Sequence, residues 1–219
     1  ARNVEAANSA CLTIQSDVSE RGAMEAAVGE AASQFGRLDI LINNAGVMYL
    51  HEPGVTPRAR WEKLLNINLL AVIEGCEAAI RHMRERDLDG RIVNVTSMAS
   101  RLKGGGIYGV SKIGVEKYTD EIRNSLEGTS IRASMVVPGG FATNLGRDLS
   151  AEEREAYRSK LGDRLETASF DSDGRTPFFG VPDDVARAVL FALAQPTFLN
   201  VSEIVVRPAV NIDPGLKST

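Results

Sequence analysis

The sequence predicts an α/β fold with a doubly wound, mostly parallel sheet. Apolar runs of strand length recur along the 219 residues, and segments with helical periodicity separate them. Because each run is apolar at successive positions, we expect buried parallel strands joined by right-handed crossovers, with helices on both faces. The runs are "CLTIQ" at 11–15, "LDILIN" at 38–43, "RIVNVT" at 91–96, "RASMVV" at 132–137 and "EIVV" at 203–206.

Helices are expected between these strands. Residues 19–35 carry apolar side chains at three- and four-residue steps, and Gly36 follows as a C-terminal cap. The same spacing predicts a longer helix over residues 58–83. Two further helices are expected over 107–126 and 183–194, the second with Asp183 as its N-cap.

Residues 144–180 interrupt the alternation with polar sequence. Ser150 and Glu153 form a capping box for the helix "SAEEREAYRSKL". An excursion of this size is either a lid over a binding cleft, a solvated flap or a subunit contact. A lid would turn Leu145, Leu149, Phe178 and Phe179 toward a substrate. We expect one domain over residues 1–219 that contains this lid-like insertion.

Composition excludes several classes of function. The chain is 43% apolar and 25% charged, with a net charge of -4, so no basic face for nucleic acid is expected. Cys11, Cys76, His51 and His82 have no disulfide or metal-ligand spacing, which favours a reducing cytoplasm and no metal site. Apolar runs are shorter than the ~18 residues of a membrane span, so no membrane partner is expected.

The segment "GGGIYG" at residues 104–109 matches G-x-G-x-x-G, a dinucleotide-binding pattern. In a true phosphate loop the first glycine follows the strand almost at once. Here "SMASRLK" separates Thr96 from the first glycine, which is too long for that turn. We therefore expect these glycines to form the loop that leads into the next helix.

Tyr108 and Lys112 lie four residues apart on one helical face, and Ser97 follows the preceding strand at its carboxyl edge. An ammonium about 4–5 Å from a phenol stabilises the phenolate by roughly 3–4 kcal/mol at an effective dielectric of ~20. That is enough to lower a tyrosine pKa by ~2–3 units, as proton transfer near neutral pH requires. Taken alone, such a pair is more often surface decoration of a helix than a catalytic pair.

With further motifs, this pair resembles the short-chain dehydrogenase/reductase family. "YGVSK" matches its Tyr-x-x-x-Lys motif, and the other motifs follow in family order from Asp17 onward. They are "NNAG" at 43–46, "NINL" with Asn68, "VTS" ending at Ser97 and "PGGFAT" at 138–143. The resemblance implies a Rossmann-like fold and hydride transfer between NADP(H), or NAD, and a small alcohol or carbonyl substrate.

The resemblance also implies catalytic roles. Tyr108 would exchange a proton with the substrate oxygen, and Lys112 would lower its pKa and bind the nicotinamide ribose. Ser97 would hydrogen-bond the substrate oxygen. Asn68 would hold a water in the proton relay, although it could instead be a buried polar group of the helix.

Family motifs also imply a cofactor site. Asp17 and Val18 of "SDV" correspond to the adenine contact, but Asp17 could instead cap the following helix. The "NNAG" asparagines could likewise only brace strand ends. The remaining expected cofactor contacts are Asn43, Asn44, Ala45, Gly46, Tyr108, Lys112, Pro138, Gly139, Phe141 and Thr143.

One family element is absent from residues 1–219, the glycine-rich phosphate loop with the first strand and helix. In the sheet order 3-2-1-4-5-6 that strand is central, so we expect an N-terminally truncated form of a longer enzyme. Arg2 then lies where NADP-preferring members place a basic residue for the 2′-phosphate, unless it is simply solvated.

Two other functions are compatible with parts of this pattern. A lyase resembling the halohydrin dehalogenases would keep Ser97 and Tyr108, but that class replaces the lysine with arginine, and Lys112 argues against it. A non-catalytic binding protein is suggested by the absent phosphate loop. The ending "SEIVVRP" resembles bacterial members acting on small hydroxy acids and alcohols. The family resemblance also implies that the helices over 58–83 and 107–126 pack across symmetry axes, in a homodimer or homotetramer.

Overall fold

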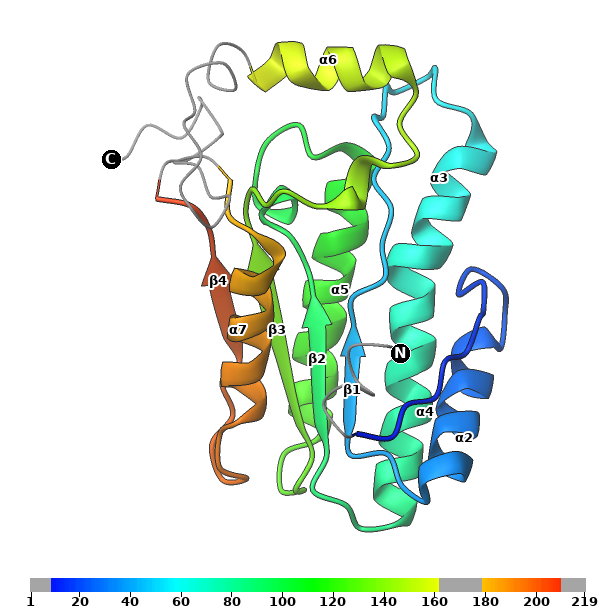
Figure 1. Ribbon diagram of the computed structural model, residues 1–219, viewed down its shortest axis with the longest axis vertical. Coiled ribbons are helices and arrows are strands. Elements are labelled where there is room, and N and C mark those ends of the chain that lie inside the picture. Colours follow the sequence, from blue (N-terminus) through cyan, green and yellow to red (C-terminus); the bar gives the residue numbers. More distant parts are fainter. Residues whose placement is uncertain (1–8, 162–178, 210–219) are drawn as a thin grey trace.

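The computed structural model describes residues 9–161 and 179–209, which contain one parallel sheet (Figure 1). Its strands lie in the order β1-β2-β3-β4, and every neighbouring pair is parallel. The carboxyl ends of all four therefore meet at one edge. The strands are β1 (Ile40–Asn43), β2 (Arg91–Val95), β3 (Arg132–Pro138) and β4 (Glu203–Val206).

Helices cover both faces of the sheet, so the doubly wound architecture is confirmed. Ile92 of β2 packs in a core shared with α4 (Ala71–Glu85) and α5 (Gly106–Ser125). Its neighbour Val93 points to the opposite face and packs with α7 (Pro182–Leu193). Successive side chains of a strand point to opposite faces, which explains why both are apolar.

The predicted helix over 58–83 is continuous, but it widens in the middle. It consists of α3 (Arg58–Leu65), a π-helical turn (Asn66–Leu70) and α4. The Ala71 N–H donates to the Asn66 carbonyl, five residues back. Single π turns inside α-helices often occur at functional sites, and this one contains Asn68.

The strand expected at residues 11–15 does not form, which corrects the sequence-based assignment. A strand needs a hydrogen-bonded neighbour, and in the described residues none pairs with the outer side of β1. Ile40 and Ile42 are each 45% exposed, on a part of the sheet at β1 that no described helix covers (Figure 1). Apolar composition therefore made residues 11–15 resemble a strand without supplying a partner.

Two helix starts also differ from expectation. Helix α2 (Ala23–Phe35) begins at Ala23 rather than residue 19, because Gly22 has a φ of 84° and breaks the helix there. Helix α7 begins at Pro182 with Val181 as N-cap, rather than at Asp183. The Val181 N–H donates to the Asp184 carboxylate at 3.2 Å, which caps this end.

Other local signals are confirmed. Gly36 ends α2 with a φ of 80°. Helix α6 (Ala151–Leu161) has the expected capping box, in which the Glu153 N–H donates to Ser150 Oγ at 3.1 Å and the Ser150 N–H donates to Glu153 Oε2 at 2.8 Å. Within the described ranges, the helices are too short or too polar to cross a bilayer.

Glu74 fixes the start of α2 against α4, which lies beside it in Figure 1. Its carboxylate accepts the Gly22 N–H at 2.6 Å and the Met24 N–H at 3.1 Å. These amides have no partner within the helix, and a carboxylate also suits the positive end of the helix dipole.

We predict that Glu74→Ala lowers the free energy of unfolding by about 1–2 kcal/mol, because it leaves two helix-start amides without their acceptor. Urea unfolding followed by circular dichroism measures the change. Glu85→Ala, an exposed position at the other end of α4, is the control and should change it little. Equal losses in the two variants would contradict this capping role.

Candidate active site

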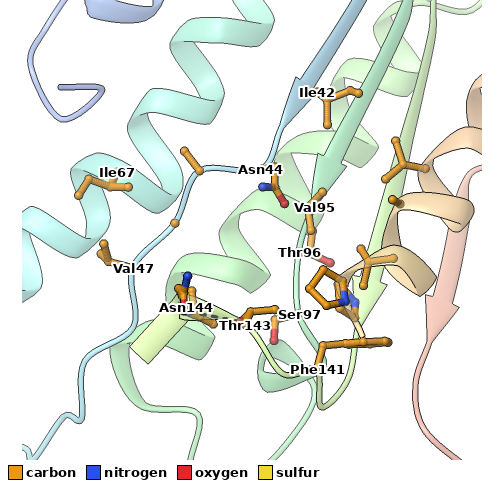
Figure 2. A pocket seen from close by; sticks show the side chains of 18 of the residues that line it. Ile42, Asn44, Val47, Ile67, Val95, Thr96, Ser97, Phe141, Thr143 and Asn144 are labelled. Atoms are coloured by element: carbon orange, nitrogen blue, oxygen red, sulfur yellow. Dashed lines mark hydrogen bonds between the residues drawn. The ribbon is translucent and has the colours of Figure 1, made fainter. Parts of the chain in front are cut away.

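A cleft of about 1510 Å³ opens at the carboxyl edge of the sheet. It exceeds the roughly 300–1,000 Å³ of ordinary small-ligand pockets, so it has room for a dinucleotide-sized ligand. Figure 2 shows Asn44, Ser97 and Thr143 around it, on the segments that follow β1, β2 and β3. The predicted residues that line it are Asp17, Val18, Asn44, Ala45, Gly46, Ser97, Tyr108, Lys112, Pro138, Gly139, Phe141 and Thr143.

Two predicted site residues lie away from the cleft surface, and a third cannot be placed. Arg2 lies outside the described residues. Asn43 points into the core, where its Nδ2 donates to Asn94 Oδ1 at 2.8 Å, so its side chain braces adjacent strands instead of lining the cleft. Asn68 lies behind the cleft wall with no exposed surface.

Asp17 lies at the cleft and also holds a local turn. It lines the cleft, yet its Oδ1 accepts hydrogen bonds from the Ser19 N–H at 2.9 Å and the Ser19 hydroxyl at 2.7 Å. These bonds to Ser19 lower the pKa of Asp17. They stabilise a turn ahead of α2 and do not cap the helix itself, whose N-cap is Gly22.

Tyr108 lies in the first turn of α5 and is buried, with its hydroxyl hydrogen-bonded to Ser97. Burial raises the pKa of Tyr108 because it disfavours the phenolate, and the Ser97 hydrogen bond opposes that rise. We expected Lys112 to lower the pKa of Tyr108. Among the protein groups alone, burial instead raises this pKa, so the expectation is wrong. The Lys112 Nζ lies 6.0 Å from the centre of the Tyr108 ring and is directed elsewhere.

Lys112 is a buried cation with unused donors. Its side chain is 4% exposed, and burial lowers its pKa to about 8. The Nζ donates to the Val95 carbonyl at 2.9 Å, the one acceptor that the described residues place within hydrogen-bond range. An ammonium has three donors, so two remain for a ligand in the cleft. Adjacent hydroxyls, such as those of a ribose, fit this donor set.

Asn68 binds the chain segment that leaves β1. Its Oδ1 accepts the Val47 N–H at 2.9 Å, and its Nδ2 donates to the Val47 carbonyl at 2.9 Å. Nδ2 also donates to Ser111 Oγ at 3.2 Å, and the Ser111 hydroxyl donates to the Tyr108 carbonyl at 2.7 Å. One side chain thus connects the β1 exit segment to the helix turn that carries Tyr108.

The glycine run packs the start of α5 against the segment that carries Ser97. A Cβ on Gly105 would lie 2.3 Å from the Ala99 carbonyl oxygen, and one on Gly109 would lie 2.6 Å from it. Neither glycine lines the cleft. Their role in the structure is this close approach, which brings Tyr108 next to Ser97.

Helix α6 contributes a residue that the sequence reasoning missed. Figure 1 shows α6 across the carboxyl end of the sheet. Arg60 of α3 pairs with Glu153 at 2.7 Å and lies 4.7 Å from the centre of the Tyr49 ring, which fixes the helix. One turn further on, the half-buried Tyr157 lies close enough to Tyr108 to raise its pKa. Its spacing of four from Glu153 was the available signal.

The four apolar residues expected on the lid separate in the structure. Leu145 lines the cleft. Leu149 is buried beside Gly146 and does not line it, and Phe179 is not among the lining residues either. Phe178 lies outside the described residues. Over the described ranges, no cluster of His, Cys, Asp or Glu could hold a metal ion.

Comparison with known proteins gives consistent matches. The family model "short chain dehydrogenase" matches residues 1–154. A glycine betaine reductase of Emericella nidulans is 30% identical over 90% of this chain, which spans 15% of that protein. An NADP-dependent 3-hydroxy acid dehydrogenase of Salmonella typhi is 27% identical over 94% of this chain and 79% of its own length.

Among solved structures, a short chain dehydrogenase from Burkholderia cenocepacia in complex with NADP superposes with a TM-score of 0.74. It is 28% identical, and the match covers 94% of this chain and 79% of that one. The family model covers most of the chain, and Ser97, Tyr108 and Lys112 line one cleft. The chain is a member of the short-chain dehydrogenase/reductase family and, like its named relatives, an oxidoreductase by descent.

Proposed function

We propose that this chain catalyses hydride transfer between NADP(H) and a small alcohol or carbonyl substrate, with Tyr108 as proton donor and acceptor. The observation that carries the proposal is the convergence of Ser97, Tyr108 and Lys112 at one end of a cleft large enough for a dinucleotide. The Salmonella relative, which is named as a hydroxy acid dehydrogenase, supports this substrate class.

In the reducing direction, the Tyr108 hydroxyl would give its proton to the carbonyl oxygen as that oxygen becomes an alcohol. Ser97 would donate its one hydroxyl hydrogen bond to the same oxygen. When bound, NADP(H) supplies the ring that gives or takes the hydride. Lys112 would hold ribose hydroxyls with its two free donors.

Asn68 would have two roles: it would hold the segment after β1 in place, and it would bind a water of the proton relay. Its Oδ1 accepts one hydrogen bond, from the Val47 N–H, and an amide oxygen can accept two. A relay water would donate to the second lone pair, and because Asn68 has no exposed surface this would have to be an internal water behind the cleft wall. Both N–H groups of Nδ2 already donate to protein acceptors. The Asn68 side chain could therefore accept a hydrogen bond from a water but could not donate one.

NADP is the proposed cofactor, with NAD as the alternative. The Burkholderia structure is a complex with NADP, and the Salmonella relative is named as NADP-dependent. Fluorescence titration of the protein with NADPH and NADH compares the two affinities. Tighter binding of NADH would reverse this choice while leaving the reaction class intact.

A homodimer or homotetramer in the cytoplasm is also proposed. Leu70, Val110 and Ile113 are large apolar side chains that are about half exposed on the adjoining π-helical turn and α5. Such a patch is typical of an interface between subunits.

We predict that Tyr108→Phe reduces kcat by roughly 100- to 10,000-fold, because it removes the proton donor. NADPH binding should stay within a few-fold of the parent. The assay follows NADPH oxidation with a panel of ketones, keto acids and hydroxy acid oxidation products. Tyr118→Phe alters another tyrosine of α5, which bonds Glu77 instead, and should keep its turnover. A parent protein that neither binds NADPH nor reduces any carbonyl would end the proposal.

The Lys112→Met variant tests whether burial of the Lys112 ammonium lowers the free energy of unfolding. The Lys112 pKa falls from 10.5 to about 8 on folding, so the unfolded chain binds the extra proton between these values. The parent should therefore gain stability as pH rises through this window, and the variant should not. At about pH 7 the free energy of unfolding of Lys112→Met should therefore exceed that of the parent. We predict that this excess becomes smaller by roughly 2–3 kcal/mol between about pH 7 and 10.

Urea unfolding at both pH values measures this difference. Lys103→Met removes an exposed lysine and serves as the control, with no such pH-dependent change expected. A pH-independent difference for Lys112→Met would show that the ammonium is not desolvated.

We predict that Ile113→Arg converts the oligomer to a monomer, because a charge at the centre of an apolar interface is left unpaired. Sedimentation velocity gives the mass in solution. Val55→Arg adds the same charge at another exposed apolar site, in the loop before α3, and should leave the assembly intact. A parent that is already monomeric would refute the assigned interface.

A further inference from the structure

Helix α5 carries a third polar residue on the face that bears Tyr108 and Lys112. Glu116 follows Lys112 by four residues, as Lys112 follows Tyr108, so the three lie in line along the helix. Glu116 is 8% exposed. A carboxylate is rarely buried without specific partners, and neither the cofactor contacts nor the proton transfer described above uses it.

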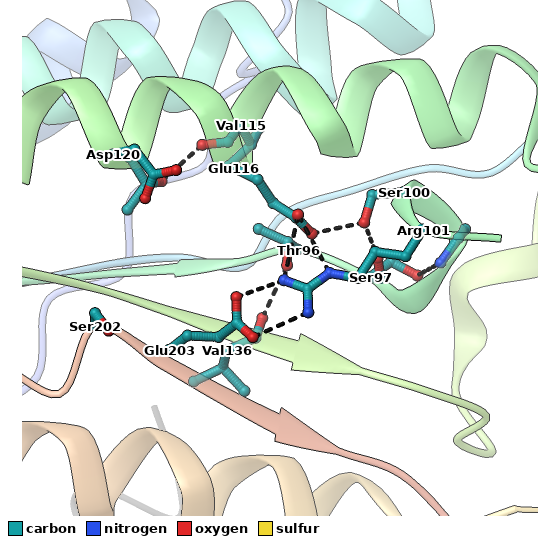
Figure 3. A network of polar contacts seen from close by, with 12 residues as sticks. Thr96, Ser97, Ser100, Arg101, Val115, Glu116, Asp120, Val136, Ser202 and Glu203 are labelled. Atoms are coloured by element: carbon teal, nitrogen blue, oxygen red, sulfur yellow. Dashed lines mark hydrogen bonds and ion pairs between the residues drawn. The ribbon is translucent and has the colours of Figure 1, made fainter. Parts of the chain in front are cut away.

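Glu116 is hydrogen-bonded to the segment that carries Ser97 (Figure 3). The Ser100 Oγ lies 2.6 Å from Glu116 Oε1 and 2.6 Å from the Ser97 carbonyl oxygen. The single hydroxyl proton of Ser100 is thus shared between two acceptors. Through this hydroxyl, α5 contacts the backbone of Ser97 directly.

Arg101 holds the carboxylate from the other side. Its Nη2 lies 3.3 Å from Glu116 Oε2, and its Nη1 donates to Glu203 of β4 at 2.9 Å. Hydrogen bonding to Glu203 raises the pKa of Arg101, so the guanidinium stays charged. Arg101 therefore joins the segment after β2 to both α5 and β4, and balances the buried charge of Glu116.

The position of Ser97 Oγ depends on this attachment. Ser97 caps the short 3-10 turn Met98–Ser100, and its Oγ accepts the Ala99 N–H at 3.2 Å. A turn of three residues has little internal stability, so its place is set by what holds Ser100 and Arg101. Both are held by Glu116, from the same helix that carries Tyr108.

We propose that Glu116, acting through Ser100 and Arg101, is a positioning residue that holds the Ser97 hydroxyl against Tyr108. The inference rests on the proposed function for its effect on turnover, but its effect on Tyr108 does not. Loss of the Glu116 contacts lets the turn shift, and a shift of about 1 Å at a reacting group lowers rates by roughly 100-fold.

The test compares Glu116→Gln with Glu121→Gln, a control on the same helix whose carboxylate forms an exposed pair with Lys117. In Glu116→Gln, kcat should fall roughly 10- to 100-fold, and the Kd for NADPH should stay within about twofold. Glu121→Gln should match the parent in both. Ser100→Ala should reproduce the loss, and the double variant should lose no more than either single one.

A second readout uses the protein without ligand. Ultraviolet difference titration against Tyr108→Phe in each background gives the pKa of Tyr108. The groups that face this phenol are Ser97, Lys112 and Tyr157, and Ser97 is the one that lowers its pKa. The pKa should therefore rise in Glu116→Gln and in Ser100→Ala, but not in Glu121→Gln.

A merely structural role would lower the melting temperature without moving this titration. Parental kcat and an unchanged Tyr108 pKa in folded Glu116→Gln overturn the inference. If that variant fails to fold, Ser100→Ala decides by the same criteria. If the parent reduces no carbonyl, the proposed function fails, and the Tyr108 titration alone still decides whether Glu116 positions Ser97.

Discussion

The geometry of the cleft depends on one buried amide, that of Asn68. Its oxygen and nitrogen pair with the N–H and C=O of Val47, as a neighbouring strand would, just where β1 has ended. A regular helix is interrupted by a π turn at this point. Because the same amide reaches Ser111 at the start of α5, the wall that contains Gly46 and the turn that contains Tyr108 keep a fixed separation. A buried amide that lost these partners would be destabilised by about 1–3 kcal/mol for each group left unpaired.

A second set of buried polar groups keeps the strands in register beneath the cleft. Asn43 and Asn94 face one another on β1 and β2, and their side chains are hydrogen-bonded at 2.8 Å. Asn94 also donates to Thr119 of α5 at 2.9 Å. A slip of one residue would leave these amides unsatisfied in an apolar core, so they specify one alignment. This explains why Asn43 lies in a cleft motif and yet points away from the cleft.

The sequence predicted what depends on local spacing, and it failed where a distant neighbour decides. Tyr108 and Lys112 were found from their helical spacing, and Ser97 from its place at a strand end. Residues 11–15 have the same apolar character as the true strands, but no pattern within them reveals that the adjoining side of β1 is unpaired in the described residues. Tyr157 and Glu116 were missed for a similar reason. Their roles come from α6 and the Ser97 segment packing against α5, contacts that are long-range in sequence.

Burial changes the electrostatic argument that spacing suggested. In water, an ammonium near a phenol would favour lysine cation and phenolate together, but in this site burial raises the pKa of Tyr108 and lowers that of Lys112. Both shifts favour the neutral forms. A neutral phenol is the form that gives a proton, so under the proposed function the protein residues by themselves prepare Tyr108 for carbonyl reduction. Alcohol oxidation needs the phenolate, and Ser97 is the side chain that stabilises it. How firmly Ser97 is held therefore affects how readily Tyr108 ionises to the form that oxidation needs.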